Sequence, residues 1–216
     1  IRPTIKMAAS STATAAAGTL LRSTRLNFSQ LSTLSVRDES GEAVRFASLY
    51  ADRRCAVFFV RHFGCYICRN YVQALTRHDL SALERTNTRL VVVGLSPPEL
   101  MAKFRVDTGY RGDLFVDPER SVYKALDLVR SQSTAELAKG SDAGFAGSFL
   151  SGMWYSLNTM IRAPVSTGDV YQQGGTFVLG PGDRCVFAHR EQGSKDNAPF
   201  DNVLKAVLED HELNSK

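Results

Sequence analysis

The sequence of 216 residues has few cysteines, no internal repeat and no pattern that predicts secretion. Four cysteines are too few for the disulfide scaffold of a small secreted protein. A continuous apolar h-region behind a basic N-terminal segment is also missing. With 44% apolar and 22% charged residues, the composition is typical of a globular protein. We therefore expect reduced thiols and a cytoplasmic location.

An excess of basic residues is lacking outside the N-terminal segment. Of the 26 Lys and Arg residues, five lie within residues 1–37, which contain no Asp or Glu. The rest of the chain carries 21 basic and 22 acidic residues, so the net charge of +4 comes from this segment. A basic surface for binding nucleic acid is therefore not predicted.

Residues 1–28 are rich in Ala, Ser and Thr, with several basic residues and no acidic ones. This composition is typical of an organelle transit peptide and also of a disordered leader. Both interpretations stay open. A transit peptide would direct the protein to a mitochondrion or plastid instead of the cytoplasm.

One uncharged segment, residues 143–161, has 19 residues and is nominally long enough to span a bilayer. It contains three glycines and five polar residues, however, which weaken a membrane-spanning helix. We expect a helix that lies over the core or caps the site, and no membrane span.

The remaining pattern predicts an α/β protein. Residues 55–61 and 89–95 are apolar runs typical of strands buried on both faces, and a helical pattern lies between them. A short crossover of this kind predicts a parallel pair. Residues 175–189 read as a hairpin, and residues 199–209 as a final helix. Together these elements predict a sheet with helices on both faces, with residues 130–170 as an insertion.

Two local predictions concern the second buried strand and the hairpin. The segment "SPPE" predicts a helix start, with Ser96 as the cap and Glu99 completing a capping box. In the hairpin, Cys185 is expected to share a strand face with Phe187 and His189.

The segment "RHFGCYIC" places two cysteines two residues apart, directly after the first buried strand. Cys65 is predicted to lie at a helix N-terminus, where open backbone N–H groups stabilise an anion. Cys68 lies one turn further on, on the same side. Arg61, His62 and Arg69 add positive charge, so the pKa of Cys65 should be lowered. This geometry predicts a redox pair in which Cys65 attacks and Cys68 resolves.

Two alternatives for the pair are a zinc site and two structural thiols. A zinc site would need Cys185 and His189 as further ligands, but along a strand they are roughly 13 Å apart. Zinc ligands must all lie within about 2.0–2.3 Å of the metal. We therefore expect no metal and no cofactor. Cys55 and Cys185 are expected to be core thiols.

Four segments resemble the peroxiredoxin-like AhpC/TSA antioxidant domain family over roughly residues 30–210. The resemblance implies a thioredoxin-like fold for residues 29–216, with a mixed central sheet, and a catalytic pair at Cys65 and Cys68. The segments are "FFVRHFGCYICRNYVQAL", "VVVGLSPPEL", "TGYRGDLFVDPERSVYKAL" and "YQQGGTFVLGPGDRCVFAHR".

The chain departs from this family's best-known motifs at two places. Peroxiredoxins carry P-x-x-x-[TS]-x-x-C, and here Phe58 and His62 stand at the Pro and Thr/Ser positions. Thioredoxins place a cis-proline before the hairpin strand that faces the cysteines, and here Gly174-Gly175-Thr176 stands there. Both departures bear on which substrate the site accepts.

The resemblance implies a thiol-dependent antioxidant oxidoreductase that reduces a peroxide or disulfide and is regenerated by a thioredoxin- or glutathione-type reductant. One alternative is a lipid-endoperoxide reductase, because a related branch reduces prostaglandin-type endoperoxides with a similar cysteine pair. Another is a non-catalytic, redox-sensitive signalling or scaffold protein, which the missing Thr/Ser favours.

Overall fold

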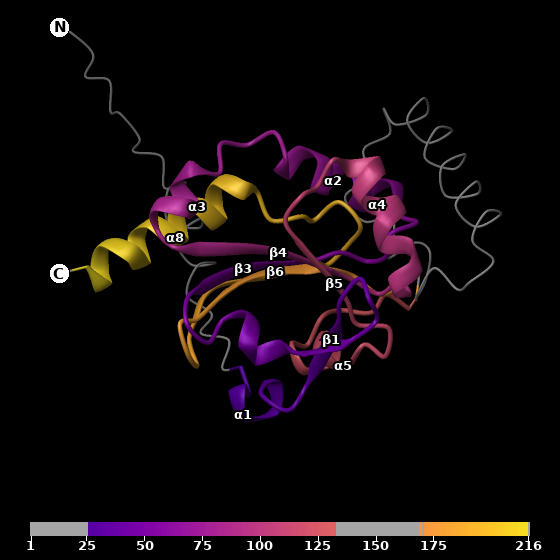
Figure 1. Ribbon diagram of the computed structural model, residues 1–216, viewed down its shortest axis with the longest axis horizontal. Helices are drawn as coiled ribbons and strands as arrows, with labels where there is room; N and C mark the ends of the chain where they lie inside the picture. Colours follow the sequence, from indigo (N-terminus) through magenta and orange to yellow (C-terminus); the bar gives the residue numbers. More distant parts are fainter. Residues whose placement is uncertain (1–25, 133–168, 170, 216) are drawn as a thin grey trace, which may run out of the picture.

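The computed structural model describes residues 26–132, 169 and 171–215. Within them the chain forms a seven-stranded sheet in the order β2-β1-β5-β4-β3-β6-β7 (Figure 1). Strands β3, β4 and β5 are parallel, and the outer strands pair antiparallel. This confirms the predicted α/β class with a mixed sheet. The strands are β1 (Ser35–Arg37), β2 (Ala43–Arg45), β3 (Arg54–Phe59), β4 (Thr88–Gly94), β5 (Asp113–Val116), β6 (Gly175–Leu179) and β7 (Cys185–Arg190).

Helices cover both faces of the sheet (Figure 1). One face carries α2, α3, α4 and α8, and the other carries α1, η1 and α5. Each group packs its own cluster of buried apolar side chains against the sheet. The helices are α1 (Phe28–Leu31), η1 (Phe46–Leu49), α2 (Tyr66–Leu75), α3 (Ser81–Arg85), η2 (Pro98–Leu100), α4 (Met101–Thr108), α5 (Ser121–Ala125) and α8 (Phe200–Asn214).

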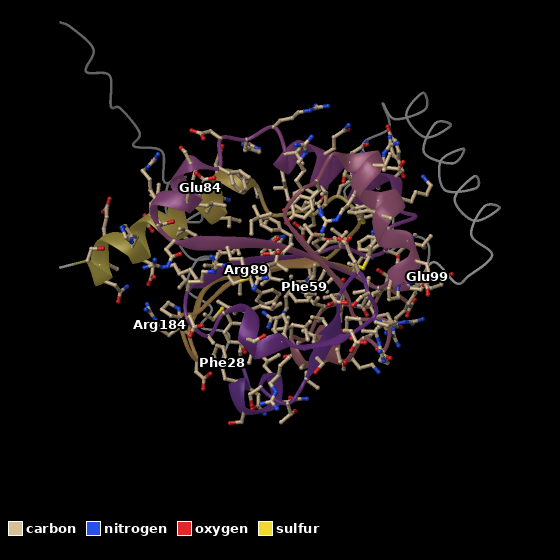
Figure 2. The ribbon with its side chains drawn as sticks, in the orientation of Figure 1. Phe28, Phe59, Glu84, Arg89, Glu99 and Arg184 are labelled. Atoms are coloured by element: carbon tan, nitrogen blue, oxygen red, sulfur yellow. The ribbon has the colours of Figure 1, made fainter. Side chains whose placement is uncertain are left out.

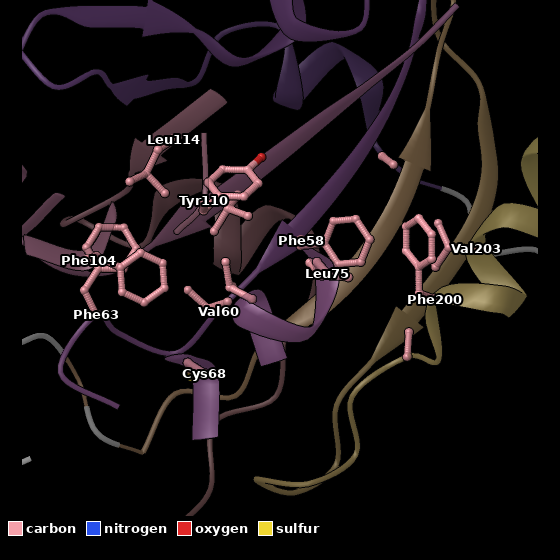
Figure 3. Close-up of a cluster of buried hydrophobic side chains, with 14 of the residues drawn as sticks. Phe58, Val60, Phe63, Cys68, Leu75, Phe104, Tyr110, Leu114, Phe200 and Val203 are labelled. Carbon is pink, nitrogen blue, oxygen red and sulfur yellow. The ribbon is translucent and has the colours of Figure 1, made fainter. Parts of the chain in front are cut away.

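Strand β3 lies near the centre of the sheet and is buried on both faces. Its successive side chains point to opposite sides, so Phe58 packs under α2 while Phe59 packs toward η1 and α5. Side chains fill both sides of the sheet in Figure 2, Phe59 among them, and Figure 3 shows Phe58 within the first cluster. β3 and β4 are parallel, as predicted, with Phe58 opposite Val92.

Tyr123 of α5 joins the carboxyl ends of β3 and β4. Its hydroxyl donates to the carbonyl oxygen of Val60 at 2.5 Å and also contacts that of Val93 at 2.9 Å. The backbone N–H of Tyr123 donates in turn to the buried carboxylate of Asp117 at 3.1 Å. The segment that leaves β3 toward α2 therefore starts from a fixed point.

A helix does start within "SPPE", as predicted, but the predicted cap is wrong. Pro97 has an extended backbone, η2 begins at Pro98 with no side-chain cap, and α4 follows from Met101. The hydroxyl of Ser96 instead accepts a hydrogen bond from the backbone N–H of Phe63 at 2.8 Å. A tertiary contact thus uses the oxygen that a cap would have needed.

The hairpin is confirmed, but Cys185 does not share a face with Phe187. The register shifts between Val178 and Leu179, so that Val178 pairs with Phe187 while Leu179 pairs with Cys185. This β-bulge turns Cys185 toward the cluster on the η1 side, whereas Phe187 packs toward α2 and α8. Sequence alternation could not show the extra residue.

The final helix is confirmed, but it extends beyond its predicted end at residue 209 to Asn214. The apolar pattern stops near that position, and an ion pair between Asp210 and Arg54 stabilises the additional turn instead. Asp210 is buried and accepts a hydrogen bond from Arg54 Nε at 2.6 Å.

Three predicted segments fall outside the described residues, apart from a few residues at their ends. They are the leader at residues 1–28, the insertion at about 130–170 and its uncharged part at residues 143–161. Among the residues that the structure describes, no helix is both long and apolar enough to cross a membrane.

Candidate functional site

The segment 61–65 connects β3 to α2 and is packed in place from two sides. The ring of Phe63 stacks on Phe104 with 4.3 Å between centroids. A Cβ on Gly94, the last residue of β4, would come within 2.5 Å of the Phe63 ring. Glycine at this position therefore allows Phe63 to lie against β4, and the chain then turns into the helix.

Cys65 is the N-cap of α2, as the sequence predicts. Its backbone is extended (φ −84°, ψ 119°), and its carbonyl oxygen accepts from the N–H of Arg69 at 3.0 Å. Its Sγ accepts a hydrogen bond from the backbone N–H of Cys68 at 3.4 Å. The sulfur thus occupies the position of a capping oxygen, where the helix dipole favours negative charge.

Arg61 provides the charge opposite this sulfur. The guanidinium is buried, and its Nη2 donates to Cys65 Sγ at 2.9 Å. The pKa of Cys65 is lowered from 9.0 to about 6: the hydrogen bond from the Cys68 thiol lowers it most, burial opposes this, and the charge of Arg61 and the backbone N–H of Cys68 lower it further. At neutral pH Cys65 is therefore mainly a thiolate.

The pKa of Cys68 is shifted in the opposite direction. Burial raises its pKa well above 9.0, and the neighbouring Cys65 raises it further. Its side chain belongs to the apolar cluster under α2, beside the helix in Figure 3. The exposed fractions are 7% for Cys65 and 4% for Cys68. The pair thus consists of one ionised and one protonated sulfur, both in reduced form.

The prediction that His62 adds positive charge is wrong. Burial lowers the pKa of His62 to about 4, so its imidazole is neutral at neutral pH. Its Nδ1 is buried and has no hydrogen-bond partner among the described residues. The other predicted cation, Arg69, places its guanidinium over the ring of Tyr66 at 5.1 Å. The direct contact with the thiolate comes from Arg61.

One titratable group near the pair was not found from the sequence. Glu191 follows β7 and is 3% exposed, and burial raises its pKa to about 8, with Cys68 raising it further. A signal was available in Gly174-Gly175, since adjacent glycines at a strand start mark a close approach of other atoms. The alternation of β7 gave no reason to expect a buried acid directly after this strand.

The two remaining cysteines are structural, as predicted. Cys55 is fully buried in β3, and burial raises its pKa to about 12. Cys185 is half-buried at the edge of the core, and burial raises its pKa to about 11. Over the described ranges, no group of three or more His, Cys, Asp or Glu side chains could hold a metal ion.

The comparisons with known proteins agree on one family. The model of the AhpC/TSA antioxidant enzyme family matches residues 74–193, a range that begins after the cysteine pair. The chain is 39% identical over 180 residues to human peroxiredoxin-like 2C, covering 82% of this chain and 79% of that protein. It is 31% identical to pig prostamide/prostaglandin F synthase, covering 78% and 80% of the two chains.

Solved structures of low sequence identity share the fold. Peroxidoxin BcpB of Mycobacterium tuberculosis superposes with a TM-score of 0.55 at 16% identity, covering 82% of this chain and 92% of that one. Peroxiredoxin Q of Xanthomonas campestris gives a TM-score of 0.54 at 14% identity, covering 88% and 96%. The predicted thioredoxin-like fold of peroxiredoxins is thereby confirmed.

Proposed function

The chain belongs to the AhpC/TSA antioxidant enzyme family, and on that premise we propose that it is a thiol-dependent oxidoreductase that reduces a peroxide or disulfide through Cys65 and Cys68. The observation that carries the proposal is the 2.9 Å contact from Arg61 Nη2 to Cys65 Sγ at the start of α2. A sulfur with this partner at a helix N-terminus is a ready nucleophile, because the thiolate is the reactive form.

In the proposed reaction, the Cys65 thiolate attacks the terminal oxygen of a hydroperoxide. The O–O bond breaks, Cys65 becomes a sulfenic acid, and the leaving alkoxide takes up a proton to form an alcohol. Deprotonated Cys68 then attacks Cys65 Sγ, which forms the disulfide and releases hydroxide that is protonated to water. A thioredoxin- or glutathione-type reductant restores both thiols and is itself oxidised to a disulfide.

A single-turnover experiment with stoichiometric peroxide tests this proposal. We expect wild-type protein to gain a disulfide between Cys65 and Cys68, identified by mass spectrometry of peptides prepared without reduction. Cys65→Ser should form no such product, and Cys68→Ser should stop at a sulfenic acid on Cys65 that dimedone traps.

The structural thiols supply the matched control, since Cys55→Ser and Cys185→Ser should form the same disulfide as wild type. Thiols that stay unreacted in the folded protein would overturn the proposal. Partner capture that is equal in wild type and in the double cysteine variant, with negligible turnover, would favour the non-catalytic alternative.

A second candidate substrate is a lipid endoperoxide. The resemblance to prostamide/prostaglandin F synthase at 31% identity supports it. An endoperoxide also contains an O–O bond that a thiolate can attack, although both oxygens stay on one product. Comparing kcat/KM for hydrogen peroxide, an alkyl hydroperoxide and a prostaglandin-type endoperoxide discriminates among these substrates, and a preference of about tenfold or more for the endoperoxide would establish this alternative.

A further inference from the structure

Glu191 is a buried acid whose carboxyl group is held in one position. Its Oε2 accepts a hydrogen bond from the backbone N–H of Gly174 at 3.1 Å. Its Oε1 accepts one from Asn197 Nδ2 at 2.6 Å. The backbone N–H of Glu191 donates back to the carbonyl oxygen of Gly174 at 3.2 Å. With 3% of its surface exposed, the side chain is fixed by both neighbours.

Glycine at position 174 leaves the room that the carboxyl group of Glu191 occupies. A Cβ at Gly174 would come within 2.1 Å of the carbonyl oxygen of Phe59 and within 2.9 Å of Glu191 Oε2. The carboxyl group therefore lies beside the end of β3, from which the chain continues to Arg61 and the cysteine pair. Any side chain at Gly174 would displace either the strand end or the carboxyl group.

Among the described residues, Glu191 interacts electrostatically with Cys68, Arg61, Tyr71 and Tyr123. Cys68 raises its pKa and Arg61 lowers it, while burial is the largest cause of its rise to about 8. The carboxylate in turn raises the pKa values of Tyr71 and Tyr123. Tyr123 also responds to Cys68, so that the acid and the second cysteine act on the same buried hydroxyl.

The charge in the site changes when Cys65 is oxidised, and this change affects Cys68. In the reduced site the Cys65 thiolate is paired with Arg61. Once Cys65 has become a neutral sulfenic acid, the guanidinium has lost that partner, and the site can hold a thiolate on Cys68. The proton that Cys68 gives up needs an acceptor, because the pair is nearly closed to solvent.

We propose that Glu191 is this acceptor: it takes the proton of Cys68 as Cys68 attacks Cys65, and passes it on to the hydroxide that leaves Cys65. This inference rests on the proposed function. In the forward step, the S–H bond of Cys68 breaks, the carboxylate of Glu191 becomes a carboxylic acid, and the S–S bond forms as hydroxide leaves Cys65. Hydroxide and the bound proton then combine, so that water is the product and Glu191 is a carboxylate again.

The first test needs no peroxide and measures the coupling directly. The Cys65→Ser background used here also carries Cys55→Ser and Cys185→Ser, so that Cys68 is its remaining cysteine and thiolate absorbance reports the ionisation of Cys68. Adding Glu191→Gln removes a negative charge, so we expect about tenfold more Cys68 thiolate near pH 8.5. Adding Glu191→Asp should leave the titration close to that of Cys65→Ser. Coinciding curves for Cys65→Ser and its Gln derivative would overturn the proposal.

The second test follows disulfide formation after peroxide at a series of pH values. We expect the wild-type rate to rise with pH through an inflection near 8, where Glu191 ionises. Glu191→Gln should lose this inflection and be slower by about tenfold or more, and Glu191→Asp should retain it. A wild-type profile that is flat between about pH 6 and 9 would overturn the proposal even if the variants fail to fold. Absence of sulfenic acid at Cys65 would overturn the proposed function instead. The first test would then decide whether Glu191 affects the ionisation of Cys68.

Discussion

Cys65 and Cys68 are the same residue type, one helical turn apart, yet their acidities shift in opposite directions. Burial opposes ionisation of both sulfurs. Cys65 overcomes it because its sulfur accepts hydrogen bonds from the Cys68 thiol, from Arg61 and from the backbone of α2. Cys68 donates to that thiolate, and such a hydrogen bond stabilises its protonated form. The division of roles between attacking and resolving sulfur follows from this difference.

Removing the guanidinium should weaken the Cys65 thiolate. In Arg61→Met we expect the pKa of Cys65 to rise from about 6 by roughly one to three pH units, because an opposite charge in direct contact is lost. Alkylation of Cys65 by iodoacetamide near pH 7 should slow by about tenfold, since fewer molecules carry the thiolate. Mass spectrometry of the modified peptide measures this rate.

Arg77→Met is the matched control, because Arg77 is exposed beyond the end of α2 and should leave the rate unchanged. Arg61→Lys should give an intermediate rate, since the charge is kept but the planar fork is lost. An unchanged rate in Arg61→Met would show that the Cys68 thiol and the helix N-terminus maintain the thiolate without Arg61.

The sequence predicted part of the candidate site at this scale. The apolar run before "GCYIC" and the helical spacing after it were sufficient to place Cys65 at a helix start. The charge of His62 was predicted wrongly because it depends on burial, which no local pattern reveals. Glu191 was missed because it lies just after β7, 126 positions away in the chain from Cys65.

At the scale of elements, the geometry of the site depends on how the segment 61–65 packs against β4. Gly94→Ala places a methyl group 2.5 Å from the Phe63 ring, so Phe63 and the segment must move. We expect a loss of about 1–3 kcal/mol in unfolding free energy from this overpacking. Urea denaturation measures the loss, and alkylation of Cys65 should slow in parallel.

A double variant separates overpacking from a general effect on β4. Phe63→Leu supplies a smaller side chain, so Gly94→Ala combined with Phe63→Leu should lose less stability than the two single variants added together. Simple additivity of the two losses would mean that the Gly94 methyl group does not act through Phe63.

Strands and helices with strong local patterns were the elements that the sequence predicted well. Continuous apolar runs identified β3 and β4, and turn residues identified the hairpin. The errors arose where a distant contact overrides local preference: Ser96 bonds to Phe63 instead of capping a helix. The bulge in β7 likewise depends on its pairing with β6, which composition does not encode.

At the scale of the whole molecule, a buried ion pair ties the C-terminal helix to the central sheet. Arg54 of β3 and Asp210 of α8 are both 9% exposed in their side chains, with 2.6 Å between Nε and Oδ2. Asp210 also accepts from Arg184 at 2.5 Å. Asp210→Asn should cost about 3–5 kcal/mol in unfolding free energy, because it leaves the guanidinium of Arg54 buried without a counter-charge. Urea denaturation measures this cost.

The adjacent pair of Lys205 and Glu209 offers a control on the same helix. These side chains are 68% and 62% exposed, with 3.8 Å between Nζ and Oε1. Glu209→Gln should therefore cost less than about 1 kcal/mol. Equal losses in Asp210→Asn and Glu209→Gln would contradict a structural role for the buried pair.

The whole account depends on an ionised sulfur at Cys65, and its pKa is the most direct test. Thiolate absorbance of wild-type protein, with Cys65→Ser subtracted, measures this pKa across a pH titration. We expect a midpoint about 6, set by the hydrogen bonds from Cys68 and the charge of Arg61. A midpoint at or above 9.0, the ordinary value, would contradict the account.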